Sequence, residues 1–138
     1  MSHGFALDPQ LAADTTPVVD LPLCSVRLSA DWTYPWLILV PRRADCSELI
    51  DLGPDDRAIL MEEIATASKV LKAMTDAHKL NVASLGNAVA QLHVHVIARF
   101  PADPAWPGPI WGKGAPLPWD RLELADFTAR LQRAFAEA

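Results

Sequence analysis

The chain has only two cysteines, Cys24 and Cys46, among its 138 residues. Two cysteines are too few for a disulfide scaffold and show no metal-type spacing, so we expect reduced thiols and a cytoplasmic protein. No apolar run reaches the ~20 residues that a membrane helix needs. A signal peptide is not expected either, because there is no basic start and Asp8-Pro9 interrupts the apolar residues 5–7. We therefore expect a soluble protein with no membrane partner.

A surplus of positive charge is also missing. The chain has 12 Lys and Arg against 17 Asp and Glu, and its net charge is −5 at pH 7. General nucleic-acid surfaces need clustered Lys and Arg, so we expect no nucleic-acid partner. Small anions remain compatible with this charge, because backbone N–H groups and imidazoles can build a phosphate site. With 51% hydrophobic residues, the chain should fold as one domain over residues 1–138.

The hydrophobic pattern predicts an α+β domain with an antiparallel sheet of about five strands. The expected strands cover residues 18–21, 24–28, 36–40, 80–85 and 91–100. A long helix should open at Gly53-Pro54, where Pro suits the first turn, and run to about His78. A C-terminal helix over about 120–138 should be capped by Asp120. A short turn of helix is expected around residues 9–13.

What the chain does have is Gln91, His93 and His95 at alternate positions of one predicted strand. Side chains alternate between the two faces of a strand, so these three should share one face, and we expect His93 on the solvent side. The apolar residues between them should face the core. Imidazoles change protonation near neutral pH, so such a pair can attack or cradle a phosphate, or hold a metal.

This strand and its surroundings resemble the histidine triad (HIT) family of nucleotide hydrolases and transferases. The family pattern has three histidines alternating with apolar residues after a Gly-Gln-Ser/Thr-type turn; here Gly86-Asn87-Ala88 forms the turn and Gln91 takes the first histidine position. Residues 34–42 resemble the family's Pro-x-His strand, with Trp36 in place of its histidine. Trp106-Pro107-x-Pro109 is similar to the Trp-Pro-rich tail of the nucleoside phosphoramidase branch. The resemblance covers about residues 20–112.

The resemblance implies a catalytic role for three residues. His93 matches the nucleophile, which attacks the α-phosphorus and leaves a nucleotidyl-histidine for water to hydrolyse. His95 would hydrogen-bond the phosphate oxygens or the leaving group. Gln91 can orient a neighbour or a phosphate but cannot carry a proton at neutral pH. No cofactor is obligatory in this mechanism, and most family members pair two sheets across a homodimer.

The resemblance also implies a binding site for a purine nucleotide or a nucleotide conjugate. Its expected contacts are Asn81, Gly86, Asn87 and Trp106. Asn87 has the alternative role of a turn residue, and Trp106 that of a packing anchor in a Pro-rich loop. Three arginines, Arg42, Arg43 and Arg99, are expected as solvated charges at strand ends.

Three functional hypotheses remain open. The first is a nucleotide phosphohydrolase or nucleotidyl transferase acting on dinucleoside polyphosphates or nucleoside phosphoramidates. The second is a catalytically weak purine-nucleotide-binding protein that acts through a partner, favoured by the missing histidines at positions 91 and 36. The third is a zinc site at His93-x-His95, for which no recognisable spacing supplies a third ligand.

Overall fold

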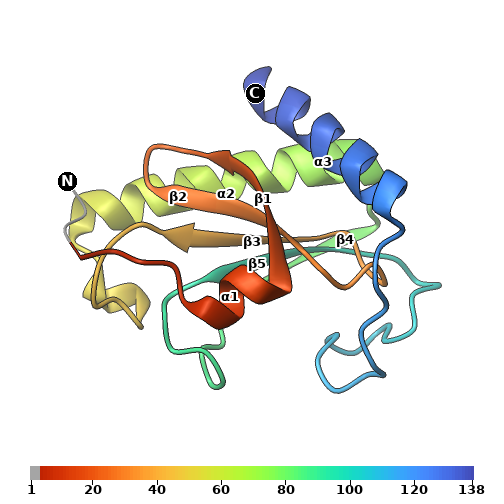
Figure 1. Cartoon of the computed structure of the whole chain (residues 1–138), viewed down its shortest axis with the longest axis horizontal. Helices are drawn as coiled ribbons and strands as arrows, with labels where there is room; N and C mark the ends of the chain where they lie inside the picture. Colours follow the sequence, from red (N-terminus) through yellow and green to blue (C-terminus); the bar gives the residue numbers. More distant parts are fainter. Residues whose placement is uncertain (1–3) are drawn as a thin grey trace.

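The computed structural model, which describes residues 4–138, is built around a five-stranded antiparallel sheet (Figure 1). The strands are β1 (Thr15–Asp20), β2 (Cys24–Ser29), β3 (Trp36–Pro41), β4 (Lys79–Ala83) and β5 (Val94–Arg99), in the order β1-β2-β3-β5-β4. The predicted α+β class and antiparallel sheet are confirmed. No helix within residues 4–138 combines the length and the apolar character that crossing a membrane requires.

Two helices cover one face of the sheet, α2 (Pro54–Thr75) and α3 (Arg121–Ala136) (Figure 1). Their apolar side chains form the main core with alternate residues of the strands. Asp120 caps α3 as predicted, because its carboxylate accepts the N–H groups of Leu122 and Glu123. The long helix α2 ends three residues before the predicted His78. Asp76 takes a left-handed conformation (φ +54°) and stops it there.

The other face of the sheet carries α1 (Pro9–Asp14) and two long connections, residues 84–93 and 101–118 (Figure 1). Leu11 of α1 packs with Ile38 and Val40 of β3. A second cluster on this face joins Tyr34 and Ile97 to Ala105 and Ile110 of the long C-terminal connection. This face therefore has several small apolar clusters instead of one helical layer, and it is the face that carries the histidines.

The interior strand β5 begins at Val94, so the prediction of a strand from Gln91 is wrong by three residues. Residues 91–93 find their hydrogen-bond partners outside the sheet. The N–H of Leu92 donates to the Cys46 carbonyl (2.9 Å), and the His93 carbonyl accepts the Ser84 hydroxyl (3.0 Å). These contacts satisfy the backbone without a ladder, and the segment enters the sheet only at Val94.

Candidate functional site

His93 and His95 lie side by side on the sheet face opposite α2. Their ring centroids are 4.9 Å apart. Both are buried, with only 7% and 5% of their surface exposed, so the expectation of a solvent-facing His93 is wrong. Two tryptophans pack against His95, Trp111 at 5.0 Å and Trp36 at 5.6 Å between ring centroids. His95 therefore has aromatic side chains on several sides.

The tautomer of His93 is set by the main chain of Gln91. His93 Nδ1 lies 2.7 Å from the Gln91 carbonyl oxygen. A carbonyl oxygen can only accept, so Nδ1 must carry the proton. In the neutral ring, Nε2 then holds the free lone pair. His93 is thus arranged as a nucleophile or base through Nε2.

The tautomer of His95 is the opposite one. Trp36 Nε1 lies 2.9 Å from His95 Nδ1. An indole nitrogen only donates, so Nδ1 accepts and the proton of the neutral ring is on Nε2. Burial, together with a smaller effect of the neighbouring His93, lowers the pKa of His95 to about 4. His95 is accordingly neutral at pH 7 and can donate one hydrogen bond from Nε2.

The side chain of Gln91 points away from this pair of rings, to the N-terminal segment. Its Nε2 donates to the Ala6 carbonyl (2.9 Å) and its Oε1 accepts the Asp8 N–H (2.8 Å). Both functional groups of the amide are therefore used by the chain itself. Gln91 reaches the candidate site through its carbonyl oxygen, not through the side chain that occupies the first triad position.

The residues expected to bind a nucleotide fall into two separate groups. Gly86 and Asn87 lie in the connection that leads to His93; Gly86 takes the left-handed conformation of this turn (φ +75°) and Asn87 is exposed. Asn81 and Trp106 instead surround Arg99. The Asn81 Oδ1 accepts from Arg99 Nη1 (2.6 Å), and the Trp106 ring lies 5.7 Å from the Arg99 guanidinium carbon.

Arg99 is buried, with 1% of its surface exposed, so the expectation of a solvated strand-end charge is wrong for this residue. Its guanidinium makes a bidentate ion pair with Asp103 (2.8 and 3.0 Å) and donates to the Gly108 carbonyl (2.8 Å). The hydrogen bonds from Arg99 hold the pKa of the Asp103 carboxyl at about 2. The cluster fixes the start of the connection that later brings Trp111 to His95.

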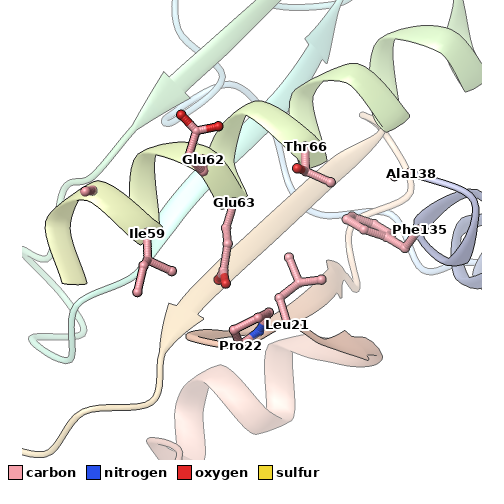
Figure 2. A pocket seen from close by; sticks show the side chains of 9 residues that line it. Leu21, Pro22, Ile59, Glu62, Glu63, Thr66, Phe135 and Ala138 are labelled. Atoms are coloured by element: carbon pink, nitrogen blue, oxygen red, sulfur yellow. The ribbon is translucent and has the colours of Figure 1, made fainter. Parts of the chain in front are cut away.

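A groove of about 490 Å³ lies on the helical side of the sheet, and the two histidines are not among its lining residues (Figure 2). Its walls come from α2, the β1–β2 turn and the end of α3 (Figure 2). Within residues 4–138, no cluster of three or more His, Cys, Asp or Glu side chains has the arrangement of a metal site. The groups described at the candidate site are the two imidazoles and their hydrogen-bond partners.

Comparison with known families identifies this arrangement. The model of the HIT domain matches residues 10–102. The chain belongs to the HIT family. Members of this family are in general nucleotide-binding hydrolases or transferases. The matched range begins ten residues before the region of resemblance in the sequence and includes α1, which packs on the sheet face that carries the histidines.

Solved HIT structures share both the fold and the length of the chain. A histidine triad protein from Bradyrhizobium japonicum is 48% identical, with a TM-score of 0.93 over 95% of this chain and 98% of its own. A HIT protein from Sinorhizobium meliloti is 47% identical, with a TM-score of 0.93 over 97% and 99% of the two chains. A histidine triad protein from Marinobacter aquaeolei is 41% identical, with a TM-score of 0.93 over 96% of this chain and 97% of its own. A comparison with curated proteins gave no significant match.

Two features of this HIT site were not predicted from the sequence. Trp111 carries no motif, and only the fold shows that it lies against His95. The position of Trp36 was noted, but its N–H bond to His95 was not. Trp36 is paired in register with Ile97, so it is a diagonal neighbour of His95, and aromatic side chains on adjacent strands reach such diagonal positions.

Proposed function

We propose that this HIT domain hydrolyses or transfers nucleotidyl groups through a covalent intermediate on His93. The substrates would be dinucleoside polyphosphates or nucleoside phosphoramidates. The nucleotide transferred to His93 would be a purine nucleotide. The observation that carries the proposal is the 2.7 Å contact of His93 Nδ1 with the Gln91 carbonyl. In the neutral ring, this contact places the proton on Nδ1 and leaves the Nε2 lone pair available as the nucleophile that the reaction requires.

In the first step, the Nε2 lone pair of His93 forms an N–P bond with the α-phosphorus, and the bond from phosphorus to the leaving group breaks. The ring gains positive charge, which the Gln91 carbonyl stabilises through the Nδ1–H bond. In the second step, water attacks the phosphorus, the N–P electron pair returns to Nε2, and the proton that the water loses passes to the solvent. No metal or other cofactor is needed in this sequence.

His95 would assist as a hydrogen-bond donor. Its Nε2–H is free because Trp36 occupies Nδ1, and a donor in a buried site stabilises the charge that develops on a phosphate oxygen. Gly86 and Asn87 would approach the phosphates from the turn before His93. The aromatic rings of Trp36 and Trp111, which pack against His95, would line the site. Asn81 and Trp106 would act less directly, through the Arg99 cluster that supports the connection to Trp111.

A second candidate function is a nucleotide-binding protein with weak or no catalysis that works through a partner. Two observations favour it. The family's imidazole is replaced at position 91 by a glutamine whose amide is engaged elsewhere, and at position 36 by a tryptophan that can only donate. Both changes remove groups that can move a proton near the reaction centre.

The deciding experiment is intact-mass analysis after brief incubation with a panel of adenylated and guanylated substrates, quenched cold. The proposal expects an added mass of one nucleoside monophosphate in the wild type and none in His93→Ala. His78→Ala is the matched control, since His78 is an exposed histidine that packs on Trp106. An adduct that persists in His93→Ala would refute the role of His93. Tight nucleotide binding with neither adduct nor turnover would establish the binding-protein function instead.

A further inference from the structure

Trp36 and His95 are joined by a hydrogen bond whose direction cannot reverse. Trp36 Nε1 lies 2.9 Å from His95 Nδ1, and the indole nitrogen has a proton but no lone pair to offer. Adding a proton to Nδ1 would place two N–H donors opposite each other at a buried position, with no acceptor between them. While Trp36 is in place, His95 therefore keeps its single proton on Nε2 and resists becoming an imidazolium.

We infer that Trp36 is a positioning residue that fixes His95 as a neutral donor and thereby selects the substrate. The inference rests on the proposed function. The selected substrates are phosphoanhydrides, whose leaving group departs as a stable anion, and the excluded ones are phosphoramidates, whose leaving amine needs a proton.

Among the described residues 4–138, the aromatic rings packed against His95 are those of Trp36, Trp111 and His93, and neither tryptophan titrates. Ile38 of β3 and Ala83 of β4 lie directly opposite His95 in the register, and Trp111 packs on its ring. The titratable neighbour is His93, which is already committed as the nucleophile through Nε2 and to Gln91 through Nδ1. The low pKa of His95, which burial lowers to about 4, agrees with this arrangement.

The balance of the reaction shows why the leaving group matters. With a phosphoanhydride, the P–O bond breaks, the electron pair stays on the bridging oxygen, and the product leaves as a phosphate anion. A terminal phosphate has a second pKa of about 6, so at pH 7 this anion needs no proton. With a phosphoramidate, the P–N bond breaks and the nitrogen must receive a proton as it leaves. Neither imidazole can give one in the tautomers seen here.

The tautomer can be measured directly on the wild-type protein by ¹⁵N NMR of the histidine rings. At pH 7 we expect His95 to have an unprotonated Nδ1 and a protonated Nε2, and His93 the reverse. Trp36→Phe removes the indole N–H and keeps an aromatic ring, so the His95 signals should shift toward a mixture of tautomers. Trp111→Phe is the matched control, because Trp111 packs on the same ring without this hydrogen bond, and it should leave the tautomer unchanged.

The substrate preference is tested with two adenylated probes, diadenosine triphosphate and adenosine 5′-phosphoramidate. General acid assistance is typically worth ~100-fold or more, so the wild type should turn over the anhydride faster by about that factor. Trp36→His supplies a ring that can accept a proton as well as donate one. It should reduce the ratio of the two rates by about tenfold or more.

The outcomes separate the inference from the proposed function. A protonated Nδ1 on His95 in the wild type would overturn the inference whatever the rates are. The expected tautomer with equal rates on both probes would overturn the substrate selection. Failure to turn over either probe or to form an adduct would refute the proposed function, and with it the substrate selection, while the NMR signals would still decide the tautomer.

Discussion

The side-chain oxygen of Gln91 accepts the main-chain N–H of Asp8 at 2.8 Å, across 83 residues of sequence. The same amide donates to the Ala6 carbonyl, so one side chain holds the N-terminal segment as a neighbouring strand would. We predict that Gln91→Ala releases this segment. Each lost hydrogen bond is worth about 0.5–1.5 kcal/mol, so amide exchange at Asp8 should accelerate by about tenfold or more in hydrogen-exchange NMR.

Gln10→Ala provides the control for this variant. Gln10 lies in the same segment, and its side-chain amide donates to Asp14, one helical turn away, at the surface. Its loss should change stability by no more than about 0.5 kcal/mol and leave the exchange of Asp8 as it is. If Asp8 exchanges at the wild-type rate in Gln91→Ala, the glutamine does not anchor the segment.

The depressed pKa of His95 predicts a specific acid sensitivity. The unfolded chain binds a proton at His95 near pH 6.5, and the folded chain only near pH 4. Between these values the unfolded state holds more protons, so the free energy of unfolding should fall as the pH drops through this window. The contribution is about 1.4 kcal/mol per pH unit. Above pH 6.5 the ring is neutral in both states and the contribution vanishes.

Chemical denaturation between pH 4 and pH 8 measures this effect. His95→Gln should flatten the curve in the window, since glutamine does not titrate. His78→Ala removes an exposed histidine and should keep the wild-type slope. Parallel curves for the wild type and His95→Gln would show that His95 is protonated alike in both states.

Glu63 is a buried carboxylate that joins α2 to the β1–β2 turn, at the edge of the groove in Figure 2. Its two oxygens accept the N–H groups of Leu23 (2.9 Å) and Cys24 (2.8 Å). Glu63→Ala leaves two buried donors unsatisfied, at about 1–3 kcal/mol each. We predict a loss of about 2–5 kcal/mol in urea denaturation. Glu62→Ala, on the exposed side of the same helix, should cost less than about 0.5 kcal/mol, and equal losses would contradict the role of Glu63.

A homodimer is expected from the family, and the structure suggests where it could be tested. β4 is an edge strand of the sheet, and Val82 on it is 49% exposed. Sedimentation at tens of micromolar should give about twice the 15.1 kDa of one chain. Val82→Lys places a charge on the edge and should shift the protein toward the monomer.

Ile50→Lys is the control for this substitution, because Ile50 is 82% exposed in a short helix away from the edge. It should leave the sedimentation unchanged. A wild-type monomer at these concentrations would refute the dimer. An intact Val82→Lys dimer would place the contact on another surface.

Sequence alone predicts those parts of the fold whose signals are local. Gly53-Pro54 and Asp120 mark helix starts by their own chemistry, and the structure begins α2 at Pro54 and α3 directly after Asp120. The prediction places the start of β5 three residues too early. Residues 91–93 bond instead to the Cys46 carbonyl and the Ser84 hydroxyl, which belong to other segments of the chain. Periodicity records which residues alternate, but it does not record which of them have a strand to pair with.

The site follows the same division. The spacing of His93 and His95 is local and places both rings on one face, as predicted. Their protonation pattern depends on Gln91 and Trp36, one acting through its carbonyl and the other from a different strand. The burial of Arg99 depends on Asp103, which lies in a Pro-rich connection without periodicity. Such pairings arise from the folded geometry and leave no pattern in the sequence.

Because β5 lies between β3 and β4, the candidate site depends on a strand that unfolds only with the rest of the sheet. His95 belongs to a strand with ladders on both sides, so its main chain cannot move independently of the sheet. Local fraying of chain ends or surface loops leaves such a strand protected, and its amides exchange only when the whole domain opens. Heat should therefore abolish activity in one step together with global unfolding, without a partly active folded form at intermediate temperature.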